Sequence, residues 1–248
     1  MIEPIIPTRY DTPYGRFYEH NGILKPSVTN AVGAITKGIG YDKWLGNYSS
    51  YEGAMEFAKK AAERGTRTHI NCEALIAGLP VLTEGMPKDE ALMLMAFKAW
   101  VDFAEPKFLA SEITMWHPDY PVAGTADIIC IIKNQLFLVD IKTGQHYDTH
   151  QLQLTGYGEL YELVYGKKPE LTGLRLSVGR GSTPSYDPKR YEYNHEGLMA
   201  AVAAFNWLNP SKPRPFIPVT IPEMIKLEDK YVKESNESNE AATENRQA

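Results

Sequence analysis

The stretch GTADIICIIKNQLFLVDIKTG, residues 124–144, decides the fold because it combines charged side chains with two strongly apolar runs. The runs flank residues 133–134, a Lys-Asn pair typical of a tight turn between antiparallel strands. Asp140 and Lys142 are separated by one residue, so on a strand they point to the same face of the sheet. The hairpin brings Asp127 within reach of both. We therefore expect two carboxylates and an ammonium group to lie together inside a sheet.

This cluster of charges needs a physical reason. Burying an unpaired charge costs roughly several kcal/mol, so the three groups must form a salt bridge, hold a metal or line a catalytic cleft. Carboxylate oxygens suit hard cations such as Mg²⁺ and Mn²⁺. A neighbouring lysine can orient an attacking water or stabilise charge that develops on a phosphate. The pattern favours phosphodiester hydrolysis, and the alternative is a buried salt bridge that fixes strand register.

Periodicity around the hairpin predicts a mixed α/β core. Residues before Pro106 are expected to be mostly helical, and the period changes to that of strands after it. Gly65 and Gly78 are expected to end the first two helices, and Pro87 to begin the third. The core order is then helix, three strands, helix, strand. We expect helices at 49–65, 66–78, 87–104, 149–166 and 195–208, and strands at 107–116, 123–133, 135–143, 171–180 and 185–194.

The composition is that of one globular domain with an appended tail. The chain has 248 residues, 43% of them hydrophobic, and no repeated segment. We expect residues 1–222 to form the domain and the acidic residues 223–248 to be disordered, because the latter contain few apolar side chains. The net charge of −5 argues only weakly against a nucleic-acid partner, since much of the negative charge lies in that tail. The composition leaves the oligomeric state open.

Two classes of protein are disfavoured. Cys72 and Cys130 are isolated, so a disulfide framework, a zinc knuckle and a four-cysteine iron–sulfur cluster are unsupported. The N-terminus lacks a basic segment followed by an apolar run, and no stretch reaches the ~20 apolar residues of a membrane span. We expect a cytoplasmic protein without a membrane partner.

Three short motifs follow one another along the chain. Gly124–Asp127 has the pattern G-x-x-D, Asp140–Lys142 has the pattern D-x-K, and Gln153–Tyr157 has the pattern Q-x-x-x-Y. With these motifs, residues 26–208 resemble the PD-(D/E)xK nucleases, and within them the RecB-like exonucleases. The resemblance implies a restriction-endonuclease-like αβββαβ core with a helical N-terminal part and extra C-terminal strands and helix. The element order expected from periodicity is the same.

The resemblance also implies a metal site. Its ion would be Mg²⁺, with Mn²⁺ able to substitute, and no iron–sulfur cluster is implied. The ligands would be His69 on an early helix, Glu112 on the strand before the G-x-x-D motif, Asp127, Asp140 and the backbone carbonyl of Ile141.

The catalytic residues implied by the resemblance overlap with these ligands. Asp127 and Asp140 would serve the reaction through the metal, and Lys142 would position or activate the water. Gln153 and Tyr157 lie at i and i+4, so one helix face presents both. They would hold DNA or Lys142 in register.

Each candidate also has a purely structural explanation. His69 could be a core histidine, Glu112 a surface acid on a strand, and Tyr157 a core aromatic. Glu73, one helical turn after His69, is a weaker candidate for the same face. The literal Pro118-Asp119 dipeptide is interpreted as a turn, because Pro and Asp are common turn residues.

The implied activity is that of a DNA exonuclease acting on single-stranded ends. The segments KPSVTNAV and RGTRTH are similar to single-strand exonucleases of phages and of mitochondrial genome maintenance. This similarity implies a role in replication or recombination in a bacterium or a phage-infected cell, with proteins of those processes as candidate partners. The alternatives are a structure-selective endonuclease with the same site and a non-catalytic DNA-binding module. Neither cleavage polarity nor a preference for DNA over RNA is indicated.

Basic and aromatic side chains offer a binding surface for such a strand. The usual role of surface charges is solvation, and the alternative is a local phosphate track with stacking faces for bases. The candidates are Lys59, Lys60, Arg64, Arg67, Arg175, Arg180, Lys189 and Arg190, with Trp44, Tyr48 and Tyr51 for stacking.

Overall fold

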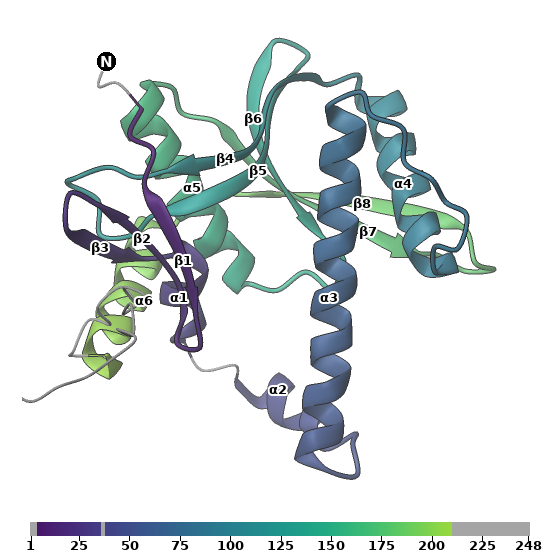
Figure 1. Ribbon diagram of the computed structural model, residues 1–248, viewed down its shortest axis with the longest axis horizontal. Coiled ribbons are helices and arrows are strands. Elements are labelled where there is room, and N and C mark those ends of the chain that lie inside the picture. Colours follow the sequence, from purple (N-terminus) through teal and green to yellow (C-terminus); the bar gives the residue numbers. More distant parts are fainter. Residues whose placement is uncertain (1–3, 36–37, 210–248) are drawn as a thin grey trace, which may run out of the picture. The chain divides into compact units, whose positions relative to one another are not determined.

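A computed structural model of the chain describes residues 4–35 and 38–209 (Figure 1). The chain divides after Pro215 into two units, and every described residue belongs to the first, Met1–Pro215. The expected acidic tail, 223–248, lies outside the described residues. No helix in the described part is long and apolar enough to cross a membrane.

A five-stranded sheet in the order β4-β5-β6-β7-β8 forms the centre of this unit. β6 and β7 are parallel, and the other neighbouring pairs are antiparallel. Residues 133–134 form the predicted turn between β5 and β6, with positive φ at both. The strands are β4 (Lys107–Met115), β5 (Gly124–Ile132), β6 (Gln135–Lys142), β7 (Glu170–Val178) and β8 (Pro184–Tyr191).

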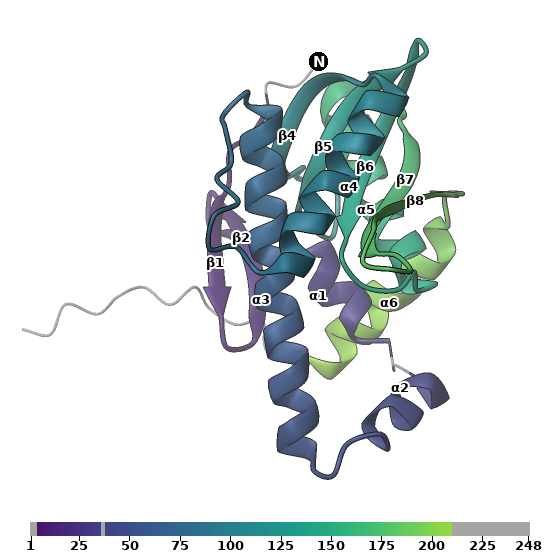
Figure 2. The same cartoon turned by 90° about the vertical axis from the view of Figure 1, so that its right-hand side faces the viewer.

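Helices cover both faces of the sheet (Figures 1 and 2). One apolar cluster joins the sheet to α3 and α4, and a second joins it to α1, α5 and α6. The parallel pair β6 and β7 is connected through α5, as a parallel connection requires. The helices are α1 (Val28–Gly33), α2 (Gly38–Leu45), α3 (Tyr51–Ile76), α4 (Lys88–Ala104), α5 (Thr149–Tyr165) and α6 (His195–Leu208).

The order α3-β4-β5-β6-α5-β7 is the predicted αβββαβ core, with α4 inserted between α3 and β4. The mixed α/β fold class predicted from the sequence is therefore confirmed. The extra C-terminal strand and helix are β8 and α6. The dipeptide at 118–119 lies in a turn, as interpreted from the sequence.

The N-terminal part differs from the prediction in two ways. Residues before α1 form a three-stranded antiparallel sheet, β1-β2-β3, that was not foreseen. The two helices expected on either side of Gly65 are one helix of 26 residues, α3. Gly65 lies inside this helix and does not end it, and the glycine allows a close approach there, since a Cβ would lie 3.1 Å from Oγ1 of Thr143. The three strands are β1 (Thr8–Thr12), β2 (Gly15–His20) and β3 (Ile23–Pro26).

The alternation along β6 determines which side chains reach the site. Val139 and Ile141 belong to the apolar cluster with α4, whereas Leu138 belongs to the cluster with α5. Asp140 and Lys142 therefore share the α5-facing side of the strand with Leu138. The sheet accepts these charges where the strand ends and the covering helix begins.

Candidate metal centre

Asp127 and Asp140 meet across the β5–β6 hairpin. Ile128 pairs with Val139, so the next residues outward, Asp127 and Asp140, stand opposite each other. The backbone N–H of Ile141 donates a 2.6 Å hydrogen bond to Oδ2 of Asp127. The Asp127 side chain is 13% exposed, and Asp140 is 2% exposed. Two carboxylates are thus held close together at the buried end of the hairpin.

His69 and Glu112 complete a group with Asp127. One ligand atom from each of the three residues lies within 4.8 Å of the other two. His69 comes from α3, and its Nδ1 is 3.4 Å from Oδ2 of Asp127. Glu112 comes from β4 and has a φ of 48°. It stands opposite Asp127, between the register pairs Ser111–Ile128 and Ile113–Ala126. The left-handed backbone of Glu112 is an uncommon conformation for a residue with a Cβ, and such conformations cluster at functional sites.

The pKa values in this group reflect the crowding of acids. Burial opposes charge on His69, but the carboxylates of Asp127 and Asp140 raise its pKa to about 9. Partial burial of the Glu112 carboxyl group, together with the charge of Asp127, raises the pKa of Glu112 to about 7. Burial also opposes ionisation of Asp127, yet its contacts with His69, Lys142 and Ile141 hold its pKa below the usual value.

Asp140 has a different environment from Asp127. Burial raises its pKa, Lys142 opposes this shift, and the charge of Asp127 adds to it. Nζ of Lys142 forms an ion pair with Oδ2 of Asp140. That oxygen is nonetheless enclosed and accepts no hydrogen bond from the described residues. Asp140 therefore faces Lys142 and is not part of the group formed by His69, Glu112 and Asp127.

The donor set fits a divalent cation. It offers an imidazole and two carboxylates at mutual distances within 4.8 Å, and the buried carboxylate of Asp140, paired with Lys142, lies next to them. Carboxylates suit Mg²⁺ and Mn²⁺, and imidazole suits the transition metals. A cation here would remove the repulsion that raises the pKa of Glu112. A divalent metal is therefore chemically plausible at this site.

A chain of hydrogen bonds joins Lys142 to α5 and α1. Nζ of Lys142 donates to Oε1 of Gln153 at 3.0 Å, and Nε2 of Gln153 donates to the Tyr157 hydroxyl at 3.0 Å. The Tyr157 hydroxyl lies 3.2 Å from Oγ1 of Thr29, the second residue of α1. The predicted i and i+4 pair on α5 does face the D-x-K strand. Thr29 was missed because its contact with α5 is long-range and no local pattern marks it.

The glycine of the G-x-x-D motif has a steric role. A Cβ on Gly124 would lie 2.5 Å from Cε1 of Tyr157, so the tyrosine ring lies directly against the backbone of β5. Tyr157 is 5% exposed and also belongs to the apolar core. The core and site explanations of this residue are therefore both compatible with its position.

The basic residues expected near His69 form ion pairs with acidic side chains. Arg64 pairs with Asp89 at 3.1 Å, and the Arg67 guanidinium binds the buried carboxylate of Glu90 at 2.6 Å. Two further bases on α3 lie near acids one turn away, Lys60 with Glu56 and Lys59 with Glu63. This part of the proposed phosphate track is not supported, because acids of α3 and α4 pair with these positive charges.

The other weaker candidates fall into two groups. Glu73 is half-buried and lies near enough for its charge to raise the pKa of Glu112. Trp44 and Tyr48 contact each other, with ring centroids 5.2 Å apart, and Tyr48 also contacts Phe57 on α3. Tyr51 is separate and 63% exposed.

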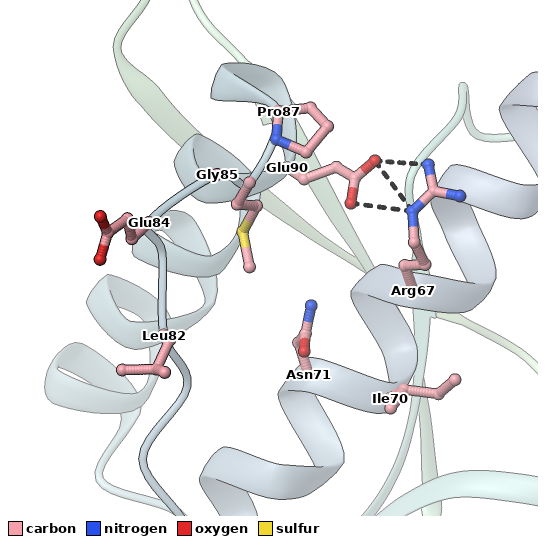
Figure 3. Close-up of a pocket in the computed structure, with 9 residues that line it drawn as sticks. Arg67, Ile70, Asn71, Leu82, Glu84, Gly85, Pro87 and Glu90 are labelled. Carbon is pink, nitrogen blue, oxygen red and sulfur yellow. Dashed lines mark hydrogen bonds and ion pairs between the residues drawn. The ribbon is translucent and has the colours of Figure 1, made fainter.

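A hollow of about 350 Å³ lies elsewhere, between α3 and the segment that leads into α4 (Figure 3). Figure 3 shows the Arg67–Glu90 ion pair on one side of it and Asn71 pointing toward it. None of the metal-site candidates lines this hollow. It is distinct from the candidate centre.

Neither a protein-family model nor a curated protein sequence matches this chain. Among solved structures, the chain is similar to SSO0001, with a TM-score of 0.39 and 14% identity over 84% of this chain and 89% of that one. It is also similar to an alkaline exonuclease, LHK-Exo from Laribacter hongkongensis, with a TM-score of 0.37 and 12% identity over 74% and 87%. The complex of LHK-Exo with dAMP gives a TM-score of 0.36 and 10% identity over 75% and 92%.

Proposed function

We propose that the protein is a metal-dependent deoxyribonuclease that hydrolyses phosphodiester bonds, acting as an exonuclease on single-stranded ends. The observation that carries this proposal is the grouping of His69, Glu112 and Asp127 within 4.8 Å, beside a buried Asp140–Lys142 pair. A purely structural salt bridge would require neither the histidine nor the additional glutamate. Such a collection of acids with one lysine matches the requirements of phosphodiester hydrolysis.

In this proposal the cation is Mg²⁺, with Mn²⁺ as a substitute. The residues that would hold it are His69, Glu112, Asp127 and Asp140, with the carbonyl of Ile141 as a further ligand. When bound, such a cation polarises a phosphoryl oxygen and lowers the pKa of a coordinated water.

Lys142 is the residue of this chain that acts on the reacting groups. Its ammonium has three donors. One donates to Gln153 at 3.0 Å and another faces Asp140, so a third is available for a water or a phosphate oxygen. The Lys142 side chain is 17% exposed, so solvent reaches part of it. Gln153 and Tyr157 are positioning residues, because they fix the direction of this ammonium group.

The motif resemblance supports the finer parts of the proposal. Similarity of the segments at residues 25–32 and 64–69 to phage and mitochondrial single-strand exonucleases favours single-stranded ends as substrate. It also favours a role in bacterial or phage replication or recombination, in the cytoplasm of the cell. The competing activity is a structure-selective endonuclease that uses the same residues.

One degradation assay tests the function. End-labelled linear and circular single-stranded DNA would be incubated with the protein in Mg²⁺, in Mn²⁺ and in chelator, with Lys142→Met as the inactive control. The proposal expects metal-dependent loss of linear strands only. Equal degradation of circles would replace the exonuclease with an endonuclease. No metal-dependent degradation of linear, circular or hairpin DNA would leave a non-catalytic binding module.

A further inference from the structure

The parallel pairing of β6 and β7 puts a second cation beside Lys142. Lys142 and Arg175 are register partners in this ladder, and Asp140 is the partner of Gly173. Register partners on neighbouring strands project to the same face of a sheet. Arg175 therefore leaves the sheet on the side that carries Asp140 and Lys142, one strand further from the β5–β6 hairpin.

Arg175 has no acceptor of its own among residues 4–35 and 38–209. Its Nε is enclosed and makes no hydrogen bond, and none of the described carboxylates forms an ion pair with its guanidinium. The nearest acid by register is Asp187 on β8, but that carboxylate lies 3.4 Å from Nε2 of His146. An enclosed N–H of a guanidinium without an acceptor is unfavourable. Arg64 on α3 also has an enclosed Nε without a partner, but its Nη1 pairs with Asp89 at 3.1 Å, whereas Arg175 forms no ion pair with a described carboxylate.

The surroundings of Arg175 add positive charge and hydrogen-bond donors. Lys189 is the register partner of Gly173 on β8, is exposed, and has its Nζ 4.8 Å from the ring centroid of Tyr191. His146 packs close to Gly173, where a Cβ would meet its ring at 3.7 Å. Lys142, Arg175 and Lys189 thus form a basic strip that extends from β6 across β7 to β8. Among the acids of β7 and β8, only Asp187, the register partner of Arg175, projects from the same face of the sheet.

We propose that Arg175 binds a phosphate group of the nucleic-acid strand, next to the phosphate that faces Lys142. A guanidinium presents parallel N–H donors that match two oxygens of one phosphate, which is why arginine is favoured at such sites. The bound strand then crosses β7 in the direction of Lys189. Arg175 is a positioning residue. The proposed nuclease function is needed only to identify the neighbouring phosphate as the one that faces Lys142.

Binding without catalysis tests this inference. Fluorescence anisotropy would measure the affinity of a labelled single-stranded oligonucleotide in chelator, at several salt concentrations, for wild type, Arg175→Ala, Arg175→Lys and Arg9→Ala. Arg9 is the matched control, because it is an exposed arginine on β1 that pairs with Asp11. Arg175→Ala should weaken binding about 10-fold and reduce the slope of log K against log salt by about 0.7, the value for one phosphate of a single strand. Arg175→Lys should recover part of the affinity, and Arg9→Ala should bind like wild type.

The arms of the assay identify the source of the phosphate. Oligonucleotides with a 5′-phosphate, a 3′-phosphate or neither would be compared. If Arg175→Ala loses affinity equally for all three oligonucleotides, Arg175 binds an internal phosphodiester. If it loses affinity for only one of them, Arg175 binds a terminal phosphate. Both outcomes support the site. Unchanged affinity in a folded Arg175→Ala, or the same loss of affinity in Arg9→Ala, overturns it. If Arg175→Ala melts far below wild type, Arg175→Gln replaces it and the same criteria apply.

The outcome is separable from that of the nuclease assay. A wild-type protein that binds the oligonucleotide through Arg175 but cleaves no DNA would refute the proposed activity and retain the phosphate site. A protein that cleaves linear strands with unchanged KM and unchanged binding in Arg175→Ala would retain the activity and refute the phosphate site.

Discussion

Nζ of Lys142 donates a 3.0 Å hydrogen bond to Oε1 of Gln153, and this contact links the end of strand β6 to helix α5. The other end of the same amide donates to the Tyr157 hydroxyl at 3.0 Å, which fixes the orientation of the amide. An amide held at both ends keeps its acceptor directed at the ammonium group. The geometry of Lys142 thus depends on two residues that touch neither Glu112 nor Asp127 in any described hydrogen bond.

Gln153→Ala should lower the rate of DNA cleavage by roughly 10- to 100-fold, because Lys142 loses its acceptor and its direction. The affinity for Mg²⁺ or Mn²⁺, measured by calorimetry, should change little. Gln151→Ala is the matched control on the same helix, since its amide binds the carbonyl of Glu192 instead. Equal rate losses in the two variants would contradict a specific role for Gln153.

Tyr157→Phe isolates the hydroxyl of Tyr157. This change removes the contacts with Gln153 and Thr29 but keeps the ring against Gly124. We expect a rate loss of about 10-fold with a melting temperature close to that of wild type. Tyr157→Ala should instead destabilise the fold by about 3–5 kcal/mol, because the ring is buried. Full activity in Tyr157→Phe would make this residue a core residue alone.

The local part of the site could be predicted from the sequence. The positions of Asp140 and Lys142 follow from the two-residue period of a strand, and those of Gln153 and Tyr157 from the four-residue spacing of a helix. Asp127 followed from the tight turn at residues 133–134. All three relationships hold between residues that are close along the chain, so they can be predicted from the sequence.

Long-range relationships escaped prediction. Thr29 reaches the site only through the packing of α1 on α5. Arg175 was a candidate for the phosphate track, but its place beside Lys142 depends on the pairing of β7 with β6. The N-terminal sheet was missed although Asn21 and Gly22, both with positive φ, form a typical hairpin turn between β2 and β3. Gly65 was taken as a helix end because propensity alone disfavours glycine, whereas packing against Thr143 favours it there.

Asp140→Asn should abolish the tight binding of Mg²⁺ or Mn²⁺ and reduce cleavage by at least 100-fold. In chelator, its melting temperature should equal or exceed that of wild type, because burial and the charge of Asp127 disfavour the ionised carboxylate. Asp187→Asn is a control acid on β8 that lies outside the metal group. Calorimetry that gave unchanged metal affinity in Asp140→Asn would refute its assignment as a ligand.

The chelated protein should lose stability as the pH rises from about 6.5 to 9. The folded pKa of His69 is about 9, above its unfolded value of about 6.5, so the protonated imidazole stabilises the fold fully below pH 6.5. This contribution disappears as the pH rises through 9. The melting temperature of wild type should therefore fall by a few degrees over this range, and that of His69→Gln should fall less. Parallel curves for the two proteins would be evidence against the His69–Asp127 interaction.

Glu112 provides a test of backbone strain at the same centre. Its φ of 48° suits glycine and is unfavourable for alanine by about 1 kcal/mol or more. Glu112→Gly and Glu112→Ala both remove the carboxylate, so metal binding and cleavage should fall alike in the two variants. In chelator, however, Glu112→Gly should be the more stable by about 1 kcal/mol in urea unfolding. Ser111, the preceding residue of β4, has no positive φ and supplies the control. There Ser111→Gly should be less stable than Ser111→Ala, because glycine is unfavourable in an ordinary strand. The same order of stability at both positions would show that Glu112 is not strained, and that the left-handed backbone does not aim its carboxylate at His69 and Asp127.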